Sequence, residues 1–133
     1  MLGGNMNKTN CFPTSQLILE GPDLSGKTSF YNQLHKISKY RWNIQDRSAL
    51  SMLVYAKLYD RDTFIEVERL NAEIKNLNNR IIILLPSWDE IERRYNKRGD
   101  DIQTITTLKK VYRLFEEAAE ELRLYPNVMV IRD

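Results

Sequence analysis

The sequence has few of the side chains that cross-link chains or ligate metals. Its 133 residues include one cysteine, Cys11, and one histidine, His35. A single cysteine cannot form an internal disulfide, which excludes a disulfide-stapled fold. His35 has no histidine or cysteine partners in the sequence, so we interpret it as a structural or solvent-edge residue and not as a catalytic one.

The chain also lacks a long apolar span, a charged and apolar leader, and an excess of charge of one sign. No segment therefore marks secretion or membrane insertion, and we predict a cytoplasmic protein without a membrane partner. The 20 Lys and Arg residues nearly balance 18 Asp and Glu residues, for a formal net charge of +2. We accordingly expect phosphate binding to be local, and nucleic acid is not an expected partner.

Length and composition fit one compact domain. A chain of 133 residues with 42% hydrophobic content can bury a genuine core but leaves little room for a second one. Residues 1–15 are rich in Asn, Gly and Thr and show no periodicity, so we predict a flexible leader there. Residues 16–133 are predicted to form the single domain.

An apolar strand followed by a glycine-framed loop occupies Leu17–Thr28. The loop has the pattern G-x-x-x-x-G-K-[ST], in which Gly21 and Gly26 let the backbone N–H groups turn toward phosphate oxygens. Lys27 would reach the β- and γ-phosphates, and Thr28 would ligate magnesium. The predicted nucleotide-binding residues are Gly21, Pro22, Asp23, Leu24, Ser25, Gly26, Lys27, Thr28 and Ser29.

Hydrophobic periodicity predicts the elements on either side of an expected edge strand. Apolar residues at helical spacing after Thr28 predict an amphipathic helix whose N-terminus favours anions. Residues Tyr40–Gln45 alternate apolar and polar side chains, which predicts an edge strand with one wetter face. The positions predicted to face the core from the helix before this strand and the helix after it are Phe30, Leu34, Ile37, Leu50, Leu53, Val54 and Leu58.

The second half of the chain repeats a pattern of helices and strands. Thr63 with Glu66, and Ser87 with Glu90, have capping-box spacing, so each pair is expected to open a helix. Gly99 is expected to end the second of these helices. The apolar run Ile81–Leu85 predicts a central parallel strand. The positions predicted to be buried in the helix after Thr63 are Phe64, Val67, Leu70, Ile74 and Leu77.

A long helix and a last strand complete the pattern. Steps of three and four between apolar residues predict a helix that continues until Pro126, and Val128–Ile131 predicts a strand. The resulting order predicts an α/β fold of the P-loop NTPase type, with three α/β/α layers around a short parallel sheet of about four strands. The stripe of the long helix is Ile105, Leu108, Tyr112, Phe115, Ala119 and Leu122.

Two segments in order resemble the thymidylate kinase branch of the P-loop nucleoside monophosphate kinases. Leu19-Glu-Gly-Pro-Asp-Leu-Ser-Gly-Lys-Thr28 matches the branch's F-E-G-x-D-G-x-G-K-T, with Asp23 on the loop aspartate. Asp46-Arg-Ser-Ala-Leu-Ser-Met-Leu-Val-Tyr-Ala56 is similar to D-R-Y-x-x-S-x-x-A-Y. The resemblance covers roughly Leu17–Asp133.

The resemblance implies that ATP gives its γ-phosphoryl group to a nucleoside monophosphate, with a deoxynucleotide as the expected acceptor. Lys27 and the loop backbone would hold the phosphates of ATP, and Thr28 would hold Mg²⁺. Arg47 would orient the acceptor phosphate, and Asp23 would face the acceptor sugar or phosphate. A homodimer is also implied, with the exposed faces of the helices after Asp46 as candidate contacts.

The carboxylate that usually helps to hold magnesium has no obvious place, because the central strand ends in Leu84-Leu85-Pro86. Asp46 or Glu20 could supply that charge through water, and Asp46 is our candidate metal residue. Two structural interpretations stay open: Asp46 could cap the following helix, and Glu20 could pair with a basic neighbour.

Arg93, Arg94 and Arg98 lie just before Gly99, where kinases of this group place a mobile lid. Arg94 and Arg98 are four residues apart and share a helical face, so both could contact one polyphosphate and offset the charge that develops during transfer. The alternative is that these residues only complement the helix dipole.

The chain departs from the family between Thr28 and Asp46, where only one helix and one strand fit. The family's extra strand and helix, with an arginine-bearing loop for the acceptor, are missing there, and Ser48 replaces the tyrosine of D-R-Y. Two other functions therefore stay open. One is a polynucleotide 5′-hydroxyl kinase, with Trp42, Tyr55 and Tyr59 as weak candidates for stacking bases. The other is a nucleotide-binding module without catalysis.

Overall fold

The structure is a computed structural model that describes residues 15–98 and 103–132. The predicted flexible leader lies outside the described residues, apart from Ser15. The predicted helix cap Gly99 lies outside them as well.

The described residues contain a parallel sheet of four strands in the order β3-β2-β4-β5. The strands are β2 (Gln16–Glu20), β3 (Ile44–Asp46), β4 (Asn79–Leu84) and β5 (Val128–Ile131). Strand β2, which leads into the glycine-framed loop before α1, lies inside the sheet between β3 and β4. The predicted central position of β4 and edge position of β3 are therefore confirmed.

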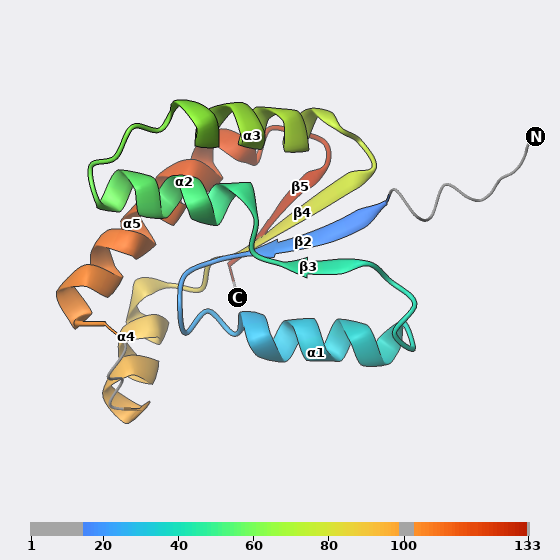
Figure 1. Cartoon of the computed structure of the whole chain (residues 1–133). Helices are drawn as coiled ribbons and strands as arrows, with labels where there is room; N and C mark the ends of the chain where they lie inside the picture. Colours follow the sequence, from blue (N-terminus) through green and yellow to red (C-terminus); the bar gives the residue numbers. More distant parts are fainter. Residues whose placement is uncertain (1–14, 99–102, 133) are drawn as a thin grey trace, which may run out of the picture.

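Helices cover the two faces of this sheet unequally (Figure 1). Helix α1 (Lys27–Ile37) lies alone on one face, below β3 and β2 in the view. Helices α2 (Ala49–Leu58), α3 (Phe64–Lys75) and α5 (Ile105–Leu122) lie on the other face. Helix α4 (Trp88–Arg98) lies beyond the carboxyl ends of the strands, near the loop that joins β2 to α1. The predicted three-layer α/β fold is confirmed.

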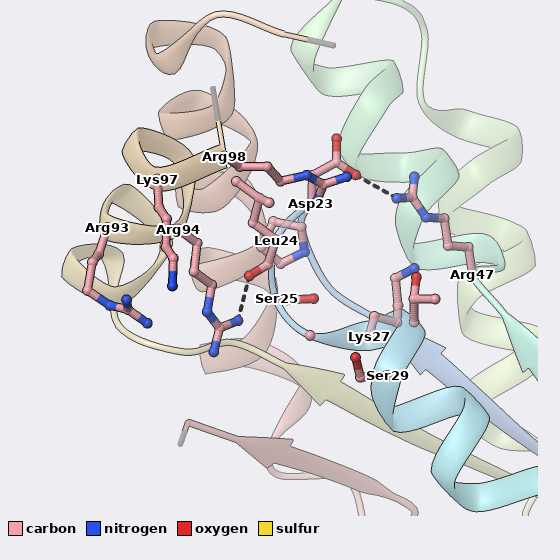
Figure 2. Close-up of a pocket in the computed structure, with 13 residues that line it drawn as sticks. Asp23, Leu24, Ser25, Lys27, Ser29, Arg47, Arg93, Arg94, Lys97 and Arg98 are labelled. Atoms are coloured by element: carbon pink, nitrogen blue, oxygen red, sulfur yellow. Dashed lines mark hydrogen bonds and ion pairs between the residues drawn. The ribbon is translucent and has the colours of Figure 1, made fainter. Parts of the chain in front are cut away.

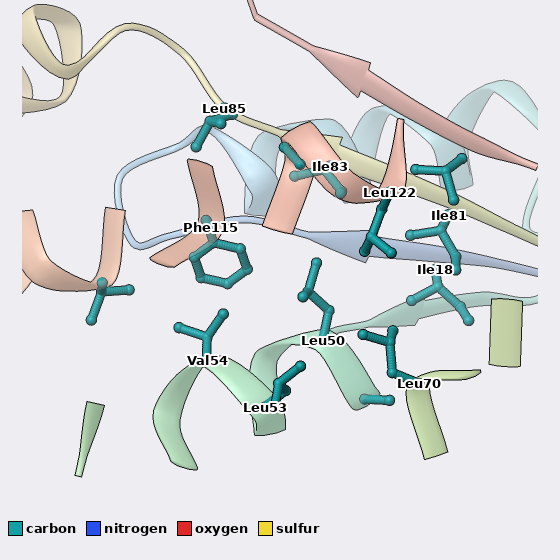
Figure 3. Packing of buried hydrophobic residues seen from close by; sticks show 14 of the residues in the cluster. Ile18, Leu50, Leu53, Val54, Leu70, Ile81, Ile83, Leu85, Phe115 and Leu122 are labelled. Carbon is teal, nitrogen blue, oxygen red and sulfur yellow. The ribbon is translucent and has the colours of Figure 1, made fainter. Parts of the chain in front are cut away.

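The main hydrophobic core lies between the sheet and helices α2, α3 and α5 (Figure 3). Ile18 of β2, Ile81 and Ile83 of β4, Leu50 of α2 and Phe115 of α5 are almost fully buried there. Each such side chain contributes about 1.5–3 kcal/mol relative to an exposed one. The predicted stripe of α5 is buried from Leu108 to Leu122. This core therefore holds α5 against the sheet whose strand β2 leads into the glycine-framed loop.

The strand predicted over Tyr40–Gln45 is shorter than expected and begins only at Ile44. Lys39 and Tyr40 have φ angles of 55° and 62°, and this left-handed backbone makes a turn that cannot continue as a strand. Trp42 is half exposed. The alternation that predicted the longer strand is thus a coincidence of residue types in a turn.

The predicted apolar stripes of α1 and α3 are only partly buried. In α3, Leu70 and Ile74 are buried, whereas Phe64 and Val67 are exposed; Leu77 lies beyond the end of the helix and is exposed as well. The Thr63 side chain makes no cap hydrogen bond, so the predicted capping box is absent; the carboxylate of Asp62 accepts from the Phe64 N–H at 3.1 Å. The stripe of α1 ends in an exposed Ile37, since no second helix flanks α1 on its face of the described structure. By contrast, the Ser87 hydroxyl accepts from the Glu90 N–H as predicted.

Candidate functional site

The glycines of the loop between β2 and α1 are required by space and by backbone conformation. Gly21 has φ 152°, and a Cβ atom built on it would lie 2.5 Å from the carbonyl oxygen of Leu84. Gly26 precedes α1 with φ 87°. The non-glycine residue Leu24 also takes a positive φ, 67°, in this tight turn. The loop therefore packs against the end of β4 and leads directly into the N-terminus of α1.

A pocket of about 830 Å³ opens over this loop, at the carboxyl ends of the strands (Figure 2). Its walls come from the loop, from the residue after β3 and from α4. The lining residues are Pro22, Asp23, Leu24, Ser25, Gly26, Lys27, Thr28, Ser29, Arg47, Arg93, Arg94, Lys97 and Arg98. The structure thus brings together every site residue predicted from the sequence except Gly21 and Asp46, which do not line the pocket.

Lys27 and Asp46 form an ion pair behind the pocket. The Lys27 ammonium nitrogen lies 2.6 Å from Oδ1 of Asp46, the last residue of β3. The Lys27 side chain is only 7% exposed, whereas that of Asp46 is 43% exposed. Asp46 is therefore a partner of the loop lysine, and the alternative in which it caps α2 is wrong, because a different carboxylate occupies that position.

Arg47 and Asp23 form a second ion pair at the pocket's edge (Figure 2). Arg47 Nη2 donates to Asp23 Oδ1 at 2.8 Å, and the side-chain amide of Gln103 donates to the other oxygen of Asp23. Burial would lower the pKa of Arg47, but the hydrogen bond and charge of Asp23, with smaller contributions from Tyr55 and Asp46, outweigh it and raise the pKa. The guanidinium is a permanent, oriented cation.

Helix α4 supplies the opposite wall through arginines held by one glutamate. Glu90 accepts from Arg93 at 2.6 Å and from Arg94 at 2.7 Å. The hydrogen bonds from Arg93 and then Arg94 lower the pKa of Glu90 to about 2. Arg94 also donates to the carbonyl oxygen of Leu24 at 2.7 Å and so joins α4 to the loop between β2 and α1.

Two residues of the site were missed by sequence reasoning. Lys97 lines the pocket one turn after Arg93, and its spacing of four residues was a signal that could have found it. Gln103 reaches Asp23 across 80 positions of the chain, and nothing local in the sequence indicates that contact. Both lie on the α4–α5 side of the loop.

Glu20 does not reach the pocket, so the idea that it supplies a metal-binding charge through water is wrong. Its side chain is fully buried and points to the start of α2, where the Ser48 N–H donates to it at 2.9 Å. Burial raises the pKa of Glu20 and outweighs the hydrogen bonds that lower it. These partners are uncharged, which also answers the alternative of a pairing with a basic neighbour.

The described residues hold no group of three or more His, Cys, Asp or Glu side chains placed to bind a metal ion. In the same part of the chain, no helix combines the length and apolar character needed to cross a membrane.

Comparisons with known proteins place the fold. No protein-family model and no curated protein sequence matches the chain. Among solved structures, the chain is similar to the YorR protein from Bacillus subtilis, which was crystallised in complex with phosphorylated GDP. The TM-score is 0.70 at 21% sequence identity, over 89% of this chain and 85% of YorR. The two proteins share their α/β fold.

Proposed function

We propose that the protein is a Mg²⁺-dependent kinase that transfers a phosphoryl group from ATP to a nucleoside monophosphate, with a deoxynucleotide as the expected acceptor. The observation that carries this proposal is the convergence of six cationic side chains on one pocket from three elements. Only Asp23 among the lining residues is acidic. Such a pocket suits ligands with several phosphates, because guanidinium and ammonium groups neutralise the negative charge of the phosphate oxygens during phosphoryl transfer.

The two walls suggest a division of labour. The loop amides, Lys27 and the arginines of α4 would hold the phosphates of ATP, since Arg94 is already joined to the loop. Arg47 follows β3, across the pocket from α4, and would orient the acceptor phosphate. Asp23 would act mainly by holding Arg47, because both of its oxygens already accept hydrogen bonds. The reaction would then rest on positioning and charge neutralisation, without a covalent intermediate.

Thr28 and Asp46 are the residues that would hold Mg²⁺. Both residues are accessible to an ion: Thr28 lies exposed at the first turn of α1, and nearly half of the Asp46 side chain is accessible. Magnesium is commonly bound by one or two protein ligands together with phosphates and water. Phosphate oxygens would compete with Asp46 for Lys27 and so leave the carboxylate available. The ion would neutralise phosphate charge.

The likeness to YorR supports a nucleotide ligand, because that protein was crystallised with phosphorylated GDP. The structure gives less support to a polynucleotide acceptor. Trp42 lines a separate groove with Leu17 and Leu77, and Tyr59 is not among the residues that line the cationic pocket. Stacking aromatics would be expected along a single-strand path that leads to the phosphates.

The test is incubation with ATP, Mg²⁺ and a panel of ribo- and deoxynucleoside monophosphates, with the products read by mass. A diphosphate formed by the wild type and absent with Lys27→Ala is the expected result and identifies the acceptor. Thermal stabilisation by ATP without any diphosphate would overturn the kinase and favour a nucleotide-binding module without catalysis. A phosphorylated 5′-hydroxyl oligonucleotide would favour the polynucleotide alternative.

We also propose a homodimer through the outer surfaces of α2 and α3. Large apolar side chains are exposed there, and contiguous exposed apolar surface marks interaction sites. These residues are Met52, Tyr59, Phe64, Ile65 and Val67. Sedimentation velocity is expected to give a dimer for the wild type and a monomer for Phe64→Glu. A wild-type monomer at all concentrations would reject this interface.

A further inference from the structure

Glu20 is the last residue of the strand that leads into the phosphate loop, and its carboxyl group is 0% exposed. It accepts from the Ser48 N–H at 2.9 Å, from the Ser51 N–H at 3.4 Å and from the Ser51 hydroxyl. All three donors belong to the start of α2. The side chain of Ser48 does not cap that helix, so the cap comes from Glu20 on strand β2.

Stability alone does not explain a carboxyl group at this position. A buried carboxylate without a cationic partner loses hydration, and a well-packed apolar side chain is often at least as stabilising. The neighbouring Glu73 increases this cost, because its charge also raises the pKa of Glu20. Glu73 nevertheless accepts from the Ser48 hydroxyl at 2.5 Å. Two carboxyl groups therefore hold the amide and the hydroxyl of one serine.

The residue before this serine is Arg47, which the pocket uses. Arg47 has φ 70°, a left-handed conformation that is strained for a non-glycine residue and needs support from its surroundings. Its N–H donates to the carbonyl oxygen of Leu19 at 2.8 Å, and the next N–H, that of Ser48, donates to Glu20. Consecutive residues of β2 thus hold consecutive amides of the segment that follows β3.

We propose that Glu20 is a positioning residue that fixes the Asp46-Arg47 segment against the phosphate loop and thereby sets the acceptor side of the pocket. Its carboxyl group binds the start of α2 while its backbone continues into Gly21. The phosphate loop and Arg47 are consequently held at one distance from each other. The inference that this geometry serves an acceptor rests on the proposed kinase function, whereas the anchoring of Ser48 does not.

The experiment compares Glu20→Gln and Glu20→Ala with Ile83→Ala. Ile83 is the register partner of Glu20 on β4, is equally buried and lies in the core, so its truncation controls for lost stability. Two quantities are measured: hydrogen exchange of the Ser48 amide in the protein without ligand, and kcat/KM for the acceptor beside the Kd of ATP.

Faster exchange of the Ser48 amide in Glu20→Ala, beyond that in Ile83→Ala, is expected. For Glu20→Ala, kcat/KM for the acceptor is expected to fall about 10²-fold, because a displaced substrate-positioning group typically has an effect of this size. The Kd of ATP should change less than about threefold. Glu20→Gln keeps one acceptor oxygen and should recover part of both. Unchanged Ser48 exchange, or equal losses in Glu20→Ala and Ile83→Ala, would overturn the proposal. A wild type without turnover but with altered Ser48 exchange in Glu20→Ala would reject the kinase and retain the anchor.

Discussion

The two walls of the cationic pocket are built by different kinds of contact. On the wall formed by the loop and the end of β3, Lys27 pairs with Asp46 and Arg47 with Asp23, each across about 20 positions of the chain. On the α4 wall, Glu90 holds its arginines at helical spacings of three and four, and the Arg93 side chain is 61% exposed. The first wall is fixed by contacts between segments distant in the chain, whereas the second depends mostly on contacts within one helix and joins the loop through the hydrogen bond from Arg94 to Leu24.

This difference predicts that mutations on the fixed wall have larger effects, and two lysines of the same pocket give the sharpest comparison. Lys27→Ala is expected to lower kcat by about 10³-fold, since a buried, preoriented cation would no longer stabilise the negative charge of the phosphoryl group during transfer. Lys97→Ala removes an exposed cation from α4 and should cost less than about tenfold. Steady-state kinetics measure both, and similar losses would show that the walls do not differ in this way.

Arg47→Ala tests whether the fixed wall serves the acceptor. We expect kcat/KM for the acceptor to fall about 10²-fold, because one charge-assisted contact preoriented by Asp23 is lost. The Kd of ATP should change less than about threefold. Arg61→Ala is the control, since Arg61 is exposed and lies over the Tyr59 ring. Equal weakening of both nucleotides would mean that Arg47 has a structural role.

Arg94→Ala tests the α4 wall. Arg94 donates to the Leu24 carbonyl, and the loss of one charge-assisted hydrogen bond of about 1.5 kcal/mol corresponds to a roughly tenfold higher KM for ATP. Arg93→Ala removes an exposed side chain that pairs with Glu90 of the same helix, and should change KM less than about threefold. If Arg93→Ala is the more harmful variant, the contact of Arg94 with the loop is not what matters.

The smallest predicted effect concerns stability and pH. The pKa of Glu20 is raised above its ordinary value of 4.5 by burial, so the folded protein binds more protons than the unfolded chain between pH 4.5 and the folded pKa. The free energy of unfolding should therefore fall as pH rises through that window. Glu20→Gln should lose this slope in urea titrations, while the contribution of Glu90 changes only below pH 4.5. The same slope in both proteins would contradict the prediction.

Much of the fold and the pocket could be predicted because the signals are local. The glycines and lysine of the loop, the apolar run of β4 and the stripe of α5 each depend on nearby residues, and the structure bears out the elements they predict. The arginines of α4 could be found in the same way, from their spacing on one helix. Their chemical roles remain predictions.

The misses arise where distant segments meet. The sequence around Tyr40 alternates as a strand does, but two left-handed residues make a turn there. Gln103 contacts Asp23, and Glu20 caps α2, only because the sheet brings these segments together. The burial of the apolar stripes of α1 and α3 was overestimated for a related reason. Periodicity predicts a helix, but the elements that cover its apolar side depend on the whole fold.

The position of β2 inside the sheet has a consequence for synthesis of the chain. The glycine-framed loop follows β2, yet its Gly21 packs against the end of β4, a strand that begins only at Asn79. A nascent chain that has emerged only as far as α3 therefore carries the complete loop sequence without the surface that shapes it. Because parallel pairing between distant segments must come first, nucleotide affinity would arise late, in one step with closure of the domain. A nucleotide would thus bind finished domains and not assist the early stages of folding.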